Sequence, residues 1–226
     1  MNSNVFLIIP VYNEKKEVLE KTVHELLKAG YSIVVIDDGS KEKIVFPNQS
    51  SVFVLRHSMN LGQGAALQTG IHFALDRGAQ YIISFDADGQ HSAADIPAML
   101  LPLQNNSADI TLASRFLKGG NHNASFLRKL VLNVGRYVNY IFTGLYLSDA
   151  HNGLRAMTPQ SAKKLIIKEN RMAHATEILF VIKKHQLKFL EVPTTVIYTE
   201  YSKRKGQSVF NSIRIFFDLI LHKLFE

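Results

Sequence analysis

Two aspartates separated by one residue, Asp86 and Asp88, are the side chains in this sequence best suited to hold a divalent metal. They follow an apolar run, 81–85, that is typical of a buried strand, so both carboxylates can point from the strand end toward one place. Carboxylate oxygens suit Mg²⁺ or Mn²⁺, and these ions also bind substrate phosphates. Such an ion would neutralise the charge that develops on a leaving diphosphate. Asp and Gly are also common turn residues, so the interpretation depends on what surrounds the motif.

Polar side chains also gather at the ends of other apolar runs. Tyr12-Asn13-Glu14 follows the first run, Asp37-Asp38 the second and Arg115 the fifth. If the runs are parallel strands, their carboxyl ends meet at one edge of a sheet, which is where such sheets bind ligands. The sequence therefore predicts one site at that edge. Asp37-Asp38 could accept hydrogen bonds there from a ribose or a base, or could simply form a turn.

The elements that must position these groups alternate between strand and helix over the first 115 residues. Short apolar runs predict strands, and apolar residues at helical spacing predict helices. The predicted strands are 5–10, 32–36, 52–55, 81–85 and 109–113, and the predicted helices are 17–29, 64–75 and 94–103. This alternation predicts an α/β fold with a mostly parallel central sheet and helices on both faces.

The second half of the chain predicts a different pattern. Its expected helices are 126–147, 161–167 and 177–185, and its expected strands are 187–192 and 195–198. No linker is visible, so we expect one domain over 1–207. Residues 208–226 predict an amphipathic helix with a wide apolar side, preceded by Lys203-Arg204-Lys205. These features favour a membrane interface, although packing on the domain or on a partner subunit stays open.

Composition limits the class of partner. The chain has 226 residues, a formal charge of +7 and no cysteine, which excludes disulfides and thiolate metal sites. The charge favours an anionic partner such as a phosphate, an acidic membrane surface or nucleic acid. The basic residues lack the interleaved aromatic pattern of an RNA-binding sheet, so no nucleic-acid partner is expected. No apolar run reaches the length of about 18 residues that a membrane-spanning helix needs.

Gly62 and Gly64 form a Gly-x-Gly at the start of a predicted helix. A dinucleotide-binding fingerprint would follow the first strand and would carry a further glycine at position 67, which is Leu67 here. We therefore expect no nicotinamide site, and we assign these glycines to packing at the helix start.

Four ordered motifs together resemble family 2 glycosyltransferases. They are 9–14 (IPVYNE), 36–40 (IDDGS), 60–66 (NLGQGAA) and 86–91 (DADGQH). The segments 113–116 (ASRF), 152–155 (NGLR) and 206–208 (GQS) extend the likeness through nearly the whole chain. The branch that the chain resembles most is that of dolichyl-phosphate mannose synthases and polyprenyl-phosphate glycosyltransferases. The resemblance implies a GT-A (nucleotide-diphospho-sugar transferase) fold and an inverting transfer of one sugar from a UDP- or GDP-sugar.

The resemblance also assigns roles to individual positions. The residues that match nucleoside-binding positions are Pro10, Tyr12, Glu14 and Asp38. The residues that match the metal and diphosphate site are Asp86, Asp88 and Gln90.

Arg115 and Arg128 resemble basic residues that hold a donor or acceptor phosphate in the family. A polyprenyl phosphate acceptor is already an anion and requires no strong general base. A sugar hydroxyl on a growing glycan would require a carboxylate base, for which Asp149 and Glu177 are the candidates. The sequence does not choose between them.

Two absences refine the expectation. The chain has no tryptophan, so it lacks the Gln-x-x-Arg-Trp motif of processive polysaccharide synthases, and transfer of a single sugar is expected. Many lipid-phosphate relatives carry transmembrane helices after the catalytic domain. Here we expect peripheral attachment at the cytoplasmic face of the membrane, through the terminal helix or a membrane-protein partner. A catalytically silent nucleotide-binding subunit is the rival hypothesis, and the intact acidic motif argues against it.

Overall fold

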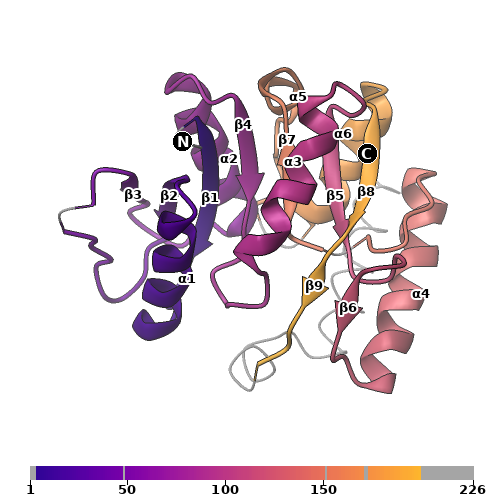
Figure 1. Ribbon diagram of the computed structural model, residues 1–226, viewed down its shortest axis with the longest axis horizontal. Helices are drawn as coiled ribbons and strands as arrows, with labels where there is room; N and C mark the ends of the chain where they lie inside the picture. Colours follow the sequence, from indigo (N-terminus) through magenta and orange to yellow (C-terminus); the bar gives the residue numbers. More distant parts are fainter. Residues whose placement is uncertain (1–3, 48, 151, 171–172, 200–226) are drawn as a thin grey trace.

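The computed structural model describes residues 4–47, 49–150, 152–170 and 173–199, apart from the side chains of Leu127 and Arg128. Its centre is a seven-stranded sheet in the order β3-β2-β1-β4-β7-β5-β8 (Figure 1). The strands are β1 (Val5–Val11), β2 (Ser32–Asp37), β3 (Val52–Arg56), β4 (Tyr81–Ser84), β5 (Ile110–Ser114), β7 (Arg155–Met157) and β8 (Phe189–Pro193). Only β7 runs antiparallel to its neighbours in this sheet, so the predicted mostly parallel sheet is confirmed.

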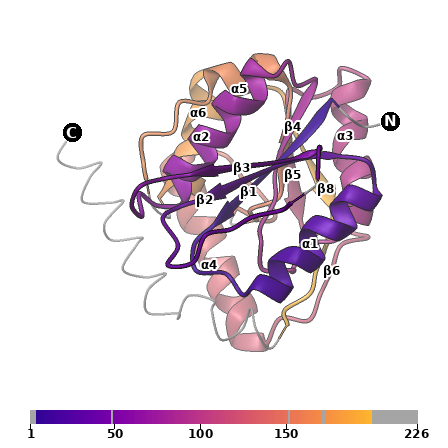
Figure 2. The ribbon, with the colours of Figure 1, turned by 90° about the vertical axis from the view of Figure 1, so that its left-hand side faces the viewer.

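Helices cover both faces of the sheet, as predicted (Figure 2). One face packs against α1 (Lys16–Lys28) and α3 (Ile96–Gln104), which follows the short 3-10 turn η1 (Ala93–Asp95). The other face packs against α2 (Gln63–Asp76), α5 (Pro159–Lys164) and α6 (His174–Lys184). The sheet is therefore the middle of three layers.

The continuous apolar run of β1 follows from this arrangement. Leu7 and Ile9 pack into the core beneath α1 and α3, while Ile8 between them packs into the core beneath α2. All three are fully buried, because a central parallel strand has no solvent-facing side. The close approach of α2 is set by Gly70, where an added Cβ would lie 2.3 Å from a methyl carbon of Ile8.

The register brings the strand ends to one edge. Ile8 on β1 pairs with Ser84 on β4, Ser84 pairs with Arg155 on β7, and Arg155 pairs with Leu112 on β5. Residues just beyond Ser84 and just beyond Leu112 therefore emerge at the same edge, on either side of the start of β7. Asp86 and Arg115 are among those residues.

The second half differs from the prediction at several points. The strand β7 and the short β6 (Asn121–His122), which pairs with β9 (Thr195–Val196), were not predicted. The predicted helix 126–147 ends earlier, as α4 (Phe126–Thr143), because Gly144 takes a φ of 70° and its N–H donates to the carbonyl of Tyr140. The other bounds shift by a few residues. The boundary between residues 207 and 208, where we expect the terminal helix to begin, lies outside the described residues.

Candidate active site

The Asp37-Asp38 turn after β2 is held almost entirely by the chain itself. The Asp38 carboxylate accepts hydrogen bonds from His57 Nδ1 at 2.7 Å and Asn60 Nδ2 at 2.9 Å. It also accepts the backbone N–H groups of Leu61 at 2.9 Å and Gly62 at 2.7 Å. A carboxylate offers about four lone-pair sites, so these donors use its capacity. Asp38 therefore fixes the loop before α2, and its predicted nucleoside contact stays a prediction.

Asp37 makes a second set of internal contacts. Its carboxylate accepts the Ser40 backbone N–H at 2.8 Å and Arg56 Nη1 at 2.7 Å. The Asp37 side chain is fully buried, whereas that of Arg56 is 36% exposed. The pair ties the end of β2 to the end of β3.

The segment after β1 docks on this turn. Asn13 has a φ of 48°, its N–H donates to Ser40 Oγ, and its side-chain oxygen accepts the Lys41 N–H. Beside it, Tyr12 is exposed and Glu14 is half-buried. Pro10, also half-buried, lies on β1 opposite Ile36. The predicted nucleoside-binding residues therefore do share one corner of the sheet edge, and Tyr12 presents a ring to solvent there.

Asp86 lies at the end of β4 with its carboxylate only lightly engaged. Gln63 Nε2 and His91 Nε2 each lie 3.3 Å from it, and the side chain is 30% exposed. Burial favours the neutral form, but the hydrogen bond with His91 and the charges of His91, His174 and Arg155 outweigh it and hold the pKa of Asp86 below its ordinary value. Asp86 is therefore a carboxylate kept ionised at an accessible place.

Asp88 lies on the same turn and accepts hydrogen bonds from the backbone and side-chain N–H groups of Gln90. Burial and the neighbouring charge of Asp86 raise the pKa of Asp88 above its ordinary value. Two carboxylates that repel each other at an accessible edge suit a divalent cation. Among the residues described, no group of three or more histidine or acidic side chains could hold a metal alone. Asp86 and Asp88 fit an ion that takes further oxygen ligands from a diphosphate or water.

Arg155 is a site residue that sequence analysis did not single out. It lies on β7, is only 4% exposed, and donates from Nη2 to the carbonyl of Ala175 at 3.3 Å. Burial lowers the pKa of Arg155 to about 10, against the opposing charges of Asp86 and Asp149. The guanidinium therefore places a buried positive charge near both Asp86 and Asp149. Arg155 ends the segment 152–155 that resembles the family, but its role, like that of His174, which also acts on Asp86, depends on the packing of β7 and α6.

The space around Asp86 is closed on one side by Gly153. A Cβ added there would lie 2.3 Å from Asp86 Oδ2. The same segment is anchored below by Ser84 Oγ, which donates to the Gly153 carbonyl at 2.7 Å. Only glycine leaves room for the carboxylate at this position.

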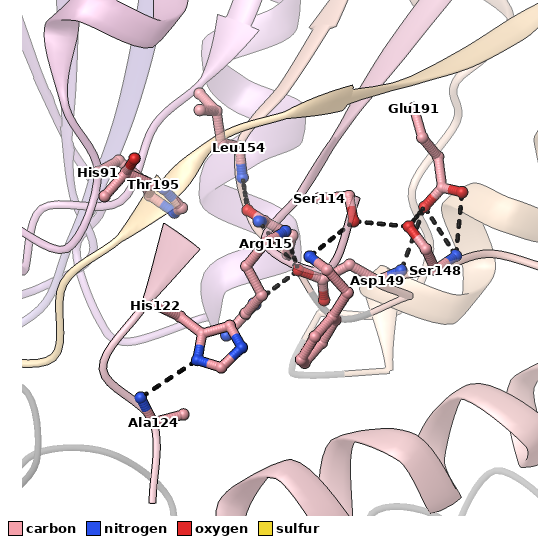
Figure 3. Close-up of polar contacts among 12 residues, drawn as sticks. His91, Ser114, Arg115, His122, Ala124, Ser148, Asp149, Leu154, Glu191 and Thr195 are labelled. Atoms are coloured by element: carbon pink, nitrogen blue, oxygen red, sulfur yellow. Dashed lines mark hydrogen bonds and ion pairs between the residues drawn. The ribbon is translucent and has the colours of Figure 1, made fainter. Parts of the chain in front are cut away.

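Arg115, at the end of β5, forms a buried network on the other side of β7 (Figure 3). Its Nε lies 2.6 Å from Asp149 Oδ2, and its Nη1 donates to the Tyr198 hydroxyl. Asn152 also donates to Asp149 Oδ2. Burial alone would lower the pKa of Arg115, but Asp149 and Tyr198 raise it, so the group stays a cation.

The Asp149 turn is itself supported from β8. Glu191 accepts hydrogen bonds from the backbone N–H groups of Ser148 and Asp149 and from the Ser148 hydroxyl at 2.7 Å (Figure 3). The Ser148 hydroxyl lies 2.6 Å from that of Ser114. Sequence analysis missed Glu191, since nothing in a predicted strand marks an acidic residue as the support of a distant turn.

Glu177 has a different placement from the rest of the predicted site. Its carboxylate accepts the backbone N–H groups of Lys168 and Glu169 at 2.9 Å. The loop that it holds packs on the start of α2, where Gly64 N donates to the Asn170 carbonyl at 2.8 Å. A Cβ at Gly64 would lie 1.9 Å from the Glu169 carbonyl oxygen, which agrees with the packing role expected for this glycine. The side chain of Arg128 is not among those described.

Known proteins are similar to this chain in sequence and in fold. The profile of glycosyl transferase family 2 matches residues 6–166. The UDP-N-acetylglucosamine–dolichyl-phosphate N-acetylglucosaminyltransferase of Methanococcus voltae is 33% identical over 97% of this chain and 96% of its own length. The undecaprenyl-phosphate mannosyltransferase of Micrococcus luteus is 28% identical over 93% of each chain.

Solved structures extend the likeness to the fold. Glucosyl-3-phosphoglycerate synthase of Mycobacterium tuberculosis, in a complex with Mn²⁺ and UDP-glucose, superposes with a TM-score of 0.69 at 13% identity. The match covers 96% of this chain and 76% of that one. With the mostly parallel, helix-flanked sheet, it confirms the expected GT-A fold.

Proposed function

Because the chain belongs to glycosyl transferase family 2, we propose that it moves one sugar from a UDP- or GDP-sugar to a polyprenyl phosphate, with inversion at the anomeric carbon. The names of the two relatives above support a lipid-phosphate acceptor. The M. voltae enzyme is named for a UDP-linked donor, which makes UDP-sugars the first donors to try.

On the donor side, Asp86 and Asp88 are the residues that would hold Mg²⁺ or Mn²⁺. When bound, such an ion would supply positive charge to the diphosphate as the sugar leaves. Arg155 adds a buried positive charge near Asp86, and Gln90 orients Asp88. Pro10, Tyr12, Glu14 and Asp38 would shape the corner that takes the nucleoside.

On the acceptor side, a phosphate oxygen would bond to the anomeric carbon while the bond from that carbon to the diphosphate breaks. The electron pair leaves with the nucleoside diphosphate, and no proton has to move. Arg115 would hold the acceptor phosphate through Nη2, since Nε and Nη1 already hold Asp149 and Tyr198. Arg128 is the second candidate for this contact.

The observation that carries this choice of acceptor is the engagement of both candidate bases. Asp149 lies in a buried ion pair with Arg115, and Glu177 holds the backbone of the loop at 168–169. A general base must reach the proton that it removes. An acceptor that is already ionised fits a site whose carboxylates are committed in this way. A sugar hydroxyl on a growing glycan, with Asp149 as its base, remains the alternative acceptor.

The acceptor implies work at a membrane. Among the described helices, none is long and apolar enough to cross a bilayer. Because the proposed acceptor is a lipid, we propose peripheral attachment to the cytoplasmic face, with the terminal segment 208–226 or a membrane-protein partner as the expected means.

A donor and acceptor panel tests the proposal. Purified protein is incubated with Mn²⁺ or Mg²⁺, UDP- and GDP-sugars and a short-chain polyprenyl phosphate, and the lipid is analysed by mass spectrometry. The expected result is a single glycosylated lipid that does not form in the presence of EDTA. NMR should show that the anomeric configuration of its sugar is inverted relative to the donor. Metal-dependent donor hydrolysis without a lipid product would overturn the acceptor and direct the search to sugar hydroxyls. Donor binding without any turnover would favour the catalytically silent subunit.

A further inference from the structure

The helix α4 carries a stripe of large apolar side chains on its outer side. We call Phe126, Leu130, Val134, Tyr137 and Ile141 the α4 stripe. They are spaced by three or four residues, so they share one face of the helix, and their exposed fractions run from 51% to 83%. With a rise of 1.5 Å per residue, the stripe is about 22 Å long.

The protein's own core does not account for this stripe. The opposite face of α4 is the one that the domain covers, where Asn139 and Thr143 are buried and the helix contacts α6. Val131 and Val138, on the flank between the two faces, are half-buried. Contiguous exposed apolar surface of this kind marks an interaction site.

The groups beside the stripe indicate which partner covers it. The Arg136 guanidinium lies 5.1 Å from the ring centre of Tyr137 and 5.4 Å from that of Tyr146, and Tyr140 packs edge-on against Tyr146. Lys129, one turn into the helix, is exposed. Tyrosine rings bordered by Arg and Lys are typical of the boundary between lipid tails and headgroups. The formal charge of +7 complements an acidic lipid surface.

We propose that the α4 stripe lies in the surface of a lipid bilayer that contains acidic phospholipids, with Lys129 and Arg136 at headgroup level. This assignment differs from attachment through 208–226, because it places the domain itself on the membrane.

The position of α4 gives this contact a use, which rests on the proposed function. The chain enters α4 directly after β6, at the side of the molecule (Figure 1). Just before the helix, the Asn123 side chain accepts the Tyr198 N–H at 2.7 Å and donates to the Tyr198 carbonyl. Tyr198 in turn accepts a hydrogen bond from Arg115. A helix lying in the bilayer surface would thus hold the Arg115 network beside lipid phosphates.

A single tryptophan tests the contact directly, since the chain has none of its own. Tyr137→Trp reports from the stripe, and Val45→Trp, at a residue 70% exposed in the loop after β2, is the matched control. With vesicles of phosphatidylcholine and phosphatidylglycerol, we expect the emission of Tyr137→Trp to move to shorter wavelength and to be quenched by brominated lipid. The emission of Val45→Trp should not change. An unchanged Tyr137→Trp emission at saturating vesicle concentration would overturn the proposal, as would an emission already shifted before lipid is added.

Charge substitutions provide the second measurement. Leu130→Glu/Ile141→Glu should weaken co-sedimentation with the same vesicles, without polyprenyl phosphate, by at least about tenfold. The control Val45→Glu/Ile166→Glu adds the same charge at exposed apolar residues elsewhere and should bind like the wild type. Equal binding of both variants would overturn the proposal. So would a change from dimer to monomer in Leu130→Glu/Ile141→Glu without lipid, which would assign the stripe to a second copy of the chain.

The two proposals fail separately in these tests. Activity on a short-chain acceptor in detergent does not require the bilayer, so Leu130→Glu/Ile141→Glu should retain it. Loss of vesicle binding with retained detergent activity supports the membrane contact. If the wild type binds vesicles through the α4 stripe but glycosylates no lipid, only the proposed function falls.

Discussion

The Asp37-Asp38 turn after β2 and the Asp86-Ala87-Asp88 turn after β4 stand at equivalent places in the sheet, and their carboxylates are bonded very differently. Asp37 and Asp38 are buried and accept short hydrogen bonds from six groups of the chain. Asp86 is partly exposed, and its contacts with Gln63 and His91 are both 3.3 Å long.

The difference separates two uses of the same residue type. A carboxylate whose lone pairs are filled by backbone and side-chain donors stabilises the loop that supplies those donors. A carboxylate left with long contacts, beside a second one and near a buried guanidinium, retains capacity for a ligand. Position after a buried strand does not distinguish these cases, because both turns follow one.

The largest effect is expected for Asp88→Asn. Loss of this charge should lower sugar transfer by roughly 10²- to 10³-fold, the usual cost of removing one electrostatic stabiliser of a leaving group. The melting temperature should stay near that of the wild type, because within the described residues the Asp88 side chain bonds only to the adjacent Gln90. Asp76→Asn, at the exposed end of α2, is the control. Transfer at the wild-type rate in Asp88→Asn would remove this carboxylate from the diphosphate site.

For Asp38→Asn we expect a loss of folding stability instead of a specific loss of sugar transfer. One amide oxygen cannot accept the four donors that now reach the carboxylate, so urea unfolding should report a loss of roughly 3 kcal/mol. A variant that is as stable as the wild type but has a raised KM for the donor would contradict this. It would mean that the nucleoside, rather than the loop, is the partner of Asp38 in the working protein.

Two glycine substitutions compare overpacking at the site with overpacking in the core. Gly153→Ala meets Asp86 and Gly70→Ala meets Ile8, each with its nearest atom at 2.3 Å. Both should destabilise the fold by roughly 1–3 kcal/mol. Measured at a temperature where both variants are folded, only Gly153→Ala should lower kcat. If Gly153→Ala and Gly70→Ala had equal kcat values, Asp86 could move aside without loss of activity.

The smallest effect is expected for Arg56→Gln. Its partner Asp37 is buried, but Arg56 is more than a third exposed, so solvent screens the pair. The free energy of unfolding, measured with urea, should fall by no more than about 1 kcal/mol. A loss of stability as large as that of Asp38→Asn would mean that Asp37 and Asp38 contribute equally to stabilising the loop.

The first half of the fold could be predicted because its signals are local. Strands such as Val5–Val11 read as unbroken apolar runs since both of their faces are buried, and helix α1 shows its buried face through Leu19, Val23 and Leu26. The GT-A fold and the gathering of Asp86, Asp88 and Arg115 at one edge follow from that pattern and from the family resemblance.

Parts of the second half could not be predicted in this way, although its helices and its last two strands were. The strand β7 is three residues long and begins with Arg155, so it has neither apolar alternation nor length to mark it. The charges of Asp86 and Asp149, which lie in two turns far apart in the sequence, offset part of the cost of burying Arg155, and this is a tertiary fact. Glu177 was a candidate base because it is acidic, and only the fold places its carboxylate on the loop at 168–169.

The antiparallel strand β7 also fixes a distance. Neighbouring strands lie about 4.8 Å apart, so inserting one strand between β4 and β5 separates their ends by about 10 Å. Asp86 extends from one of these ends and Arg115 from the other, with Gly153 between them where β7 enters the sheet. The strand order therefore sets the width of the gap between Asp86 and Arg115, across which a sugar would be transferred. Side-chain substitutions can alter what lines that gap, but its width would change only if the sheet were rebuilt.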